Sequence, residues 1–266
     1  MRRIIFWLVI ALMLFTFLFP VFWVYITSLK SPEDIFNTGL IFKPTLYNYE
    51  YIIHVRPAMW QLLNSMIVAV ASTLFVMLIA IPAAYSFARF NTGNGHILFI
   101  TISTRMFPGV VAAIPFFVLF RDIGLLDTHL GLTLLYIYFN MSFATFLLYG
   151  FFKEIPASLE YAAMIDGYDR LTILRKVVFP LIKPGVAITT VFCLIWAWNE
   201  FLYAFLFTRR VARTVSVELS TFWGSVEIQW GPMAALMGIA ILPTLVAAWI
   251  MQRHVIRGLT FGAVKG

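Results

Sequence analysis

Six long apolar runs constrain this chain more than any other feature of its sequence. Each is close to the roughly 20 residues that a helix needs to cross the hydrocarbon core of a bilayer. Helices are the expected form, because a segment in lipid must satisfy its own backbone hydrogen bonds and the runs are too long for barrel strands. The sequence therefore predicts an all-α membrane protein with six transmembrane helices. The spans are expected near residues 4–29, 62–88, 97–120, 130–152, 185–207 and 233–251.

The composition points to the same class of protein. Of the 266 residues, 62% are hydrophobic and 12% are charged, whereas soluble domains contain about 45–50% apolar and about 25% charged residues. An apolar excess of this size requires lipid as the solvent, and a share of 17% aromatic residues suits a lipid-facing surface. Membrane lipid is therefore an expected partner of the chain.

The first apolar run could also be a secretory signal peptide, because Arg2 and Arg3 form a positive start. However, the run from Ile4 to Leu29 is much longer than the about 7–15 apolar residues of a signal peptide. No pattern of small residues for cleavage precedes Lys30. We expect this run to be a retained membrane anchor.

The orientation follows from the basic residues. With the N-terminus inside, 11 lysines and arginines fall on the inner side and 7 on the outer side. Acidic residues balance the outer side, so the formal net charge of +7 lies on the inner side, as the positive-inside rule expects. The sequence therefore predicts cytoplasmic N- and C-termini. The basic charge reflects topology and does not indicate a nucleic-acid partner.

The inward-facing segment between the fourth and fifth spans predicts two short helices joined by a turn. Pro156 suits the first turn of a helix. Gly167 suits a helix end that needs a left-handed backbone, and Asp169 can cap the next helix. Pro180 and Pro184 are expected to end that second helix before the fifth span begins.

The first of these helices has two possible roles. The small side chains of Ala162 and Ala163 would let it sit closely in a groove of another protein, and Glu160, Asp166 and Asp169 could pair with a basic rim there. Alternatively, the segment could be an ordinary amphipathic loop at the membrane interface. The residue types alone leave both roles open.

A longer pattern in this segment resembles a known family. The string Glu160-Tyr-Ala-Ala-Met-Ile-Asp-Gly167, followed by Phe179-Pro180-Leu181, is similar to the EAA loop of the permease subunits of ABC importers. The Asp-Gly pair is typical of the MalG-type branch, which imports carbohydrates. The chain departs from the pattern at Tyr161, where alanine is common, and at Phe179 before the proline.

The resemblance extends over nearly the whole chain. Trp198-Asn-Glu-Phe201 resembles a stretch in the fifth span of that family, and Asn64-Ser65 is a familiar opening of the second span. The ending Gly258–Gly266 resembles the C-terminal tail of MalG-type subunits, which reaches the interface with the ATPase. The family also places the outward loop before the last span, here Thr208–Pro232, against a binding protein.

The resemblance implies a single permease domain over residues 1–266, with a coupling loop at 153–184 and a tail at 252–266, in a bacterial inner membrane. It implies a second homologous permease subunit, two ATP-binding subunits and an extracytoplasmic solute-binding protein. The imported solute would be a sugar or a related compound, moved by alternating access. The implied residues at the ATPase are Glu160, Tyr161, Ala162, Ala163, Asp166 and Gly167 in the loop, and Gly258, Gly262 and Lys265 in the tail.

The chain carries no Walker A string, so we expect no ATPase activity of its own, with ATP and Mg²⁺ held by the partner subunits. The histidines are dispersed and Cys193 is the only cysteine, so neither a metal site nor a disulfide is expected. No cofactor is expected on this chain. Asp122 and Asp127, on either side of Gly124, are expected to be solvated.

Four residues within spans are candidates for the translocation path. Arg105 could form an inner gate, or it could reach back to the nearby interface. Glu200 could contact the solute, although a structural role beside Asn199 is equally plausible. Trp198 could stack on a sugar ring, but aromatic residues near an interface usually anchor the protein in the membrane.

Two other functions compete with the importer. A secondary transporter driven by an ion gradient would show internal repeats, interrupted helices and ionisable residues at the membrane midplane, and here only Glu200 is a fair candidate for such a residue. A membrane-anchored scaffold without transport activity is the third class. Transport without any ATPase subunit would favour the carrier, and an absence of transport in any reconstitution would favour the scaffold.

Overall fold

The structure is a computed structural model that describes residues 2–106, 108–224 and 228–262, with side chains as far as Gln252. It is built of helices, and the described residues form no strand beyond one isolated bridge between Trp223 and Ile228. The chain divides into two compact units. Unit 1 comprises Met1–Leu63 and Thr214–Pro243, and unit 2 comprises Asn64–Arg213 and Thr244–Gly266.

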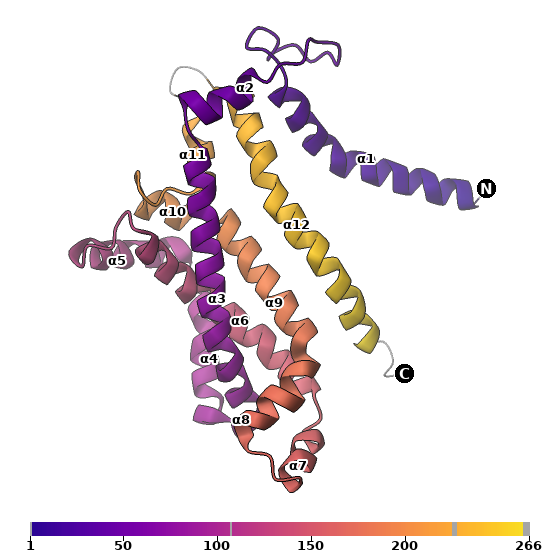
Figure 1. Ribbon diagram of the computed structural model, residues 1–266, viewed down its shortest axis with the longest axis vertical. Helices are drawn as coiled ribbons and strands as arrows, with labels where there is room; N and C mark the ends of the chain where they lie inside the picture. Colours follow the sequence, from indigo (N-terminus) through magenta and orange to yellow (C-terminus); the bar gives the residue numbers. More distant parts are fainter. Residues whose placement is uncertain (1, 107, 225–227, 263–266) are drawn as a thin grey trace. The chain divides into compact units, whose positions relative to one another are not determined.

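Unit 1 contains the N-terminal helix, the first residues of α3 and the first part of α12 (Figure 1). Both α3 and α12 continue into unit 2. Helix α1 is apolar along its length, and its most hydrophobic window is 0% buried within the structure, as expected of a surface that faces lipid or another apolar partner. The helices of this unit are α1 (Arg2–Ser28), α2 (Tyr47–Glu50), η1 (Tyr51–Val55), α11 (Val215–Thr221) and the beginnings of α3 (Met59–Phe90) and α12 (Trp230–Gly262).

Unit 2 holds a buried apolar cluster in which α6 packs along α9 and to which α3 also contributes side chains. Ala80 and Ala84 on α3 and Ala144 on α6 are among the small residues of this cluster, and such residues are usual between packed membrane helices. Apart from α3 and α12, its helices are η2 (Thr92–Gly95), α4 (His96–Ser103), η3 (Thr104–Met106), α5 (Gly109–Asp122), α6 (His129–Glu154), α7 (Ser158–Ile165), α8 (Arg170–Ile173), η4 (Leu174–Val178), α9 (Phe179–Asn199) and α10 (Leu202–Phe207).

Five helices in the described part of the chain are long and apolar enough to cross a membrane. They are Arg2–Ser28, Met59–Phe90, His129–Glu154, Arg170–Asn199 and Trp230–Gln252, and they include most of five expected spans. The expected single span at 97–120 is instead a bent pair, in which Thr92–Met106 and Gly109–Asp122 meet at 97°. Pro108 stands at the start of α5 and has no N–H to donate, which disfavours a continuous helix through this position. A sixth crossing exists if this pair forms one span.

The expectation that Pro180 and Pro184 end a short helix was wrong. Helix α8, the π-helical turn η4 and helix α9 form one helical run from Arg170 to Asn199, with both prolines inside it. The π turn lies directly before Phe179, so Pro180 falls in the first turn of α9, where its missing N–H is tolerated. The run ends at Glu200, whose backbone is extended, and α10 forms the remainder of the expected span at 185–207.

The close contact of α6 and α9 generates the first prediction. A Cβ atom at Gly185 on α9 would lie 2.4 Å from Cγ of Phe151 on α6, whereas a Cβ at Gly150 would meet no atom within 4 Å. Gly185→Ala should therefore lower the free energy of unfolding by about 1–3 kcal/mol through overpacking. Gly150→Ala is the matched control and should be neutral or stabilising, since alanine favours helix by about 0.5–1 kcal/mol. Equal thermal stability of the two purified variants in detergent would contradict the packing described here.

Candidate functional site

Glu160 fastens helix α7 to the end of helix α3. Its side chain is 2% exposed, and Oε1 accepts a hydrogen bond from Nε of Arg89 in a buried ion pair. Oε2 accepts a hydrogen bond of 2.7 Å from the hydroxyl of Tyr85. Arg89 also donates from Nη2 to the backbone oxygen of Ile155, at 2.8 Å. The last turns of α3 therefore hold both α7 and the chain that leads into it.

This arrangement corrects the expected position of Glu160. Its charge does not face a basic rim of another protein, because Arg89 and Tyr85 neutralise and bury it inside the chain. Ala163 is also buried, whereas Tyr161 and Ala162 on the same helix are exposed. Sequence reasoning missed Arg89 because it lies 71 residues from Glu160, at the end of a different span.

The end of α7 has the geometry that its glycine predicts. Gly167 has φ of +86°, so the expected left-handed backbone is confirmed. Its N–H donates to the oxygen of Met164 and the N–H of Tyr168 donates to the oxygen of Ala163, which is the bonding pattern of a Schellman motif. The carboxylate of Asp169 then accepts from the N–H of Leu171, which confirms the expected cap of α8. Helices α7 and α8 therefore join through one fixed turn (Figure 1).

The outer face of α7 is apolar. Tyr161 is 61% exposed and Ile165 is 87% exposed, and Ala162 lies beside them. Asp166 and Gly167, the other predicted coupling residues, are exposed at the end of the helix. Tyr161 and Ile165 stand four residues apart, so they share one face of α7, and this face can contact either another protein or the membrane interface.

Glu200 has a structural role at the gap between α9 and α10. Its Oε1 accepts from the N–H of Tyr203 at 3.0 Å, and its Oε2 accepts from the N–H of Ala204 at 3.1 Å. The hydroxyl of Tyr136 on α6 donates to Oε2 at 3.0 Å. The carboxylate therefore caps α10 and ties it to α6, which favours the structural role for this residue over contact with the solute.

The other candidates for the path differ in their exposure and in their contacts. Trp198 is buried, and Asn199 is exposed and bonds to the backbone oxygen of Ile195 on its own helix. The guanidinium of Arg105 lies 4.8 Å from the ring centre of Phe143, which makes it a cation–π contact on α6.

Asp127 organises a turn far along the chain, contrary to the expectation that it is solvated. Its carboxylate accepts hydrogen bonds of 2.9–3.2 Å from four consecutive backbone N–H groups. Burial raises its pKa, but these four donors outweigh burial and hold the pKa below its usual value. Asp122, in contrast, is exposed and pairs only with exposed Arg121 among the described acidic and basic residues. The four donors are Arg209, Arg210, Val211 and Ala212.

Asn64 holds the same turn by donating hydrogen bonds to two backbone carbonyl groups of the turn. Its Nδ2 donates to the backbone oxygens of Val211 at 2.8 Å and Arg213 at 2.9 Å. Its Oδ1 lies 2.7 Å from Nε2 of His129, and since Oδ1 only accepts, this ring nitrogen carries the proton. Asn64, at the start of the second expected span, is thus bonded to His129 and to the turn. No spacing in the sequence indicated these partners.

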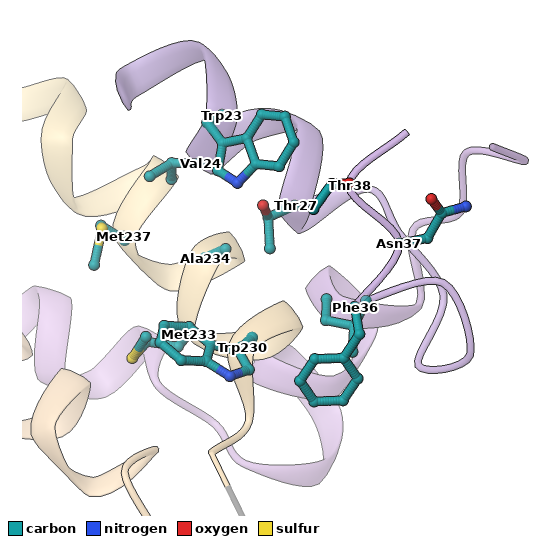
Figure 2. A pocket seen from close by; sticks show the side chains of 11 residues that line it. Trp23, Val24, Thr27, Phe36, Asn37, Thr38, Trp230, Met233, Ala234 and Met237 are labelled. Carbon is teal, nitrogen blue, oxygen red and sulfur yellow. The ribbon is translucent and has the colours of Figure 1, made fainter. Parts of the chain in front are cut away.

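Unit 1 contains two further features. Arg56 forms an ion pair of 3.0 Å with Glu218 on α11 and donates to Thr221 at 2.6 Å, which anchors α11 within this unit. A cavity of about 430 Å³ lies between the end of α1 and the start of α12. Figure 2 shows its mainly apolar walls, with none of the four candidates for the translocation path among them. The labelled lining residues are Trp23, Val24, Thr27, Phe36, Asn37, Thr38, Trp230, Met233, Ala234 and Met237.

Comparison with known proteins identifies the family of this chain. Residues 76–260 match the family described as binding-protein-dependent transport system inner membrane component. The sulfoquinovosyl glycerol transport system permease SmoH of Agrobacterium fabrum is 36% identical over 96% of this chain and 92% of its own length. The trehalose transport system permease SugB of Mycobacterium tuberculosis is 34% identical over 100% of this chain and 99% of its own length.

A solved structure shares the fold. It is the crystal structure of a bacterial ABC transporter involved in the import of the acidic polysaccharide alginate, with a TM-score of 0.79 and 23% identity. The match covers 95% of this chain and 95% of that chain.

The buried pair under α7 generates the second prediction. Glu160→Gln keeps the shape of the side chain but leaves the guanidinium of Arg89 buried without its counter-charge, which should lower the free energy of unfolding by about 3–5 kcal/mol. Tyr85→Phe removes only one hydrogen bond and should lower it by about 1 kcal/mol. The measurement is thermal unfolding of the purified variants in detergent.

A double variant separates charge from packing. Arg89→Met with Glu160→Met replaces both charges by apolar side chains, and it should be more stable than Glu160→Gln because no buried charge is left unpaired. If Glu160→Gln unfolded at the temperature of the unmodified protein, the pair would not hold α7.

Proposed function

This chain belongs to the family of binding-protein-dependent transport system inner membrane components, and we propose from this membership that it is one permease subunit of an ATP-driven importer of a sugar or a sugar-like solute. The resemblance to the permeases of carbohydrate ABC importers is confirmed by these matches. The chain is a multi-pass protein of the inner membrane. The sugar class rests on the relatives, since SmoH and SugB are both named for carbohydrate transport.

One structural observation supports the proposal. Helix α7 is buried on one side, whereas its other side is apolar and exposed. The buried side is locked to α3 by the ion pair of Glu160 and Arg89. The exposed side presents Tyr161, Ala162 and Ile165. We assign this exposed side to contact with an ATP-binding subunit on the cytoplasmic face, with Asp166 and Gly167 at its edge. Glu160 and Ala163 then act by positioning the helix, because neither side chain faces outward.

The same geometry provides a route from ATP hydrolysis to the translocation path. A displacement of α7 acts on α3 through Arg89, because that contact is buried and fixed on both sides. It also acts on α9, because the turn at Gly167 leads into a single helical run from Arg170 to Asn199. A movement of α7 is therefore passed on to two spans, α3 and the helical run Arg170–Asn199. Alternating access needs such a coupled movement of spans within a permease subunit.

The remaining partners follow from this role. A second permease subunit completes the path, two ATP-binding subunits hold ATP and Mg²⁺, and a solute-binding protein delivers the solute to the outward loop Thr208–Pro232. The C-terminal residues are assigned to the ATPase interface. Helix α12 extends through Gly258 to Gly262, and Lys265 lies outside the described residues.

The exposed face of α7 generates a third prediction. Ile165→Glu places a charge on the surface that should contact the ATP-binding subunit, so co-purification of that subunit should fall at least about tenfold, because an unpaired charge in an interface costs more than about 1.4 kcal/mol. Ile123→Glu is the matched control, because Ile123 is also exposed but lies in the connection between α5 and α6, which we assign to the outer face. Uptake of radiolabelled disaccharides into proteoliposomes that contain ATP should follow the same pattern. Normal co-purification and uptake with Ile165→Glu would refute the assigned surface.

The assigned orientation is a fourth prediction. In a Cys193→Ala background, cysteines at Asp122 and Asp166 should react with a membrane-impermeant maleimide from opposite sides of the membrane. Both positions are exposed, so a lack of reaction from one side reports topology and not burial. Modification of both cysteines from the same side would contradict the six-span arrangement.

A further inference from the structure

Glu200 and Phe201 separate helix α9 from helix α10, within a segment that is expected to cross the membrane. Glu200 has an extended backbone, and neither the N–H of Phe201 nor the backbone oxygen of Asn199 has a hydrogen-bond partner among the described residues. Lipid acyl chains offer no partner to such groups, so a spanning segment leaves them only where water or protein can bond them. The break between α9 and α10 therefore borders water or another protein, and not lipid alone.

The side chains on either side of Glu200 lie on the exposed side of this break. Asn199 and Phe201 are exposed, whereas the carboxylate of Glu200 turns inward and bonds to α6 and α10. This alternation is typical of an extended chain, in which side chains two residues apart lie on the same side. Nδ2 of Asn199 donates to the backbone oxygen of Ile195, which leaves Oδ1 available to accept a hydrogen bond. A polar amide therefore accompanies Phe201.

Phe201 and Phe205 form an aromatic surface beside this amide. Their ring centres are 5.3 Å apart and their planes differ by 24°, so the two rings are stacked. They stand one helical turn apart and are 41% and 50% exposed, while Tyr203 and Ala204 between them are buried. Helix α10 therefore packs against unit 2 with one face and presents two nearly parallel rings on the other.

We propose that Phe201 and Phe205 form a stacking platform for a pyranose ring of the imported solute, with Asn199 as the adjacent hydrogen-bonding residue. The inference rests on the proposed function, which supplies the solute and the translocation path. The C–H groups on one face of a pyranose are weakly positive and the face of an aromatic ring is negative, so the two surfaces attract each other. Small-molecule sites combine such apolar walls with a few polar groups that fix orientation. An open-chain polyol has no flat face of this kind, so the platform favours cyclic sugars.

The test uses the complete transporter in proteoliposomes, with ATP inside and its solute-binding protein outside. The probes are radiolabelled trehalose, maltose and lactose, and the measured quantity is the number of sugar molecules taken up per ATP hydrolysed. Phe201→Leu keeps an apolar side chain but removes the ring, so this ratio should fall about threefold to tenfold, as expected for the loss of one stacking contact. Asn199→Leu should lower the ratio by a similar factor. Stimulation of ATPase activity by the loaded binding protein should stay at the unmodified level in both variants.

Two control variants separate stacking from packing. Phe201→Tyr keeps the ring and should retain the ratio of the unmodified transporter. Phe146→Leu removes another exposed ring from a span, since Phe146 on α6 is 54% exposed, and it should leave the ratio unchanged. Co-purification of the second permease subunit is measured for every variant, because a contact between subunits would also leave Phe201 and Phe205 exposed in the single chain.

The outcomes separate this inference from the proposed function. If the unmodified transporter imports a probe and Phe201→Leu imports it with the same ratio, the platform is refuted and the proposed function stands. If Phe201→Tyr or Phe146→Leu lowers the ratio as much as Phe201→Leu does, or if Phe201→Leu releases the second permease subunit, the rings serve packing and the inference is overturned. If the unmodified transporter takes up none of the three sugars, the proposed function fails and the inference fails with it.

Discussion

The buried ion pair between Glu160 and Arg89 is the contact that holds helix α7 in place and so fixes the face that we propose contacts an ATP-binding subunit. Removing two charges from water is unfavourable, and the pair persists because its remaining hydrogen-bonding groups are satisfied by Tyr85 and by the backbone of Ile155. Both charges also sit where helix dipoles favour them, with Glu160 in the first turn of α7 and Arg89 in the last turn of α3. A helix of only eight residues gains a fixed place in this way.

The sequence predicted much of this architecture from local physical chemistry. Apolar length located most of the spans, the turn at Gly167 followed from backbone sterics, and the cap at Asp169 followed from its position before a helix. These features depend on neighbouring residues, so a linear pattern contains them. The break of the third span at Pro108 was missed because a run of apolar residues looks the same whether its backbone is continuous or bent.

The contacts that hold these segments together were harder to predict because they join distant residues. Glu160 was expected to pair outside the chain, and Asp127 was expected to be solvated, yet their partners lie at Arg89 and in residues 209–212. Neither partner stands at a spacing that periodicity can reveal. The carboxylate of Asp127 binds backbone N–H groups, which every residue type except proline carries, so no residue type marks these partners in the sequence. The continuous helix through Pro180 shows a similar limit, since the π turn that accommodates the proline has no signature in composition.

The bend before α5 restricts which residues this chain can accept during evolution. The hydroxyl of Tyr203 on α10 donates a hydrogen bond of 2.9 Å to the backbone oxygen of Gly109, at the first residue of α5. A Cβ atom at position 109 would lie 2.6 Å from that hydroxyl oxygen, so every other amino acid would push Tyr203 away. Tyr203 is also bound by Glu200 through its backbone. Glycine at 109 and tyrosine at 203 are therefore linked by this contact, whereas the bond from Glu200 goes to the backbone N–H of residue 203 and would persist with another side chain there.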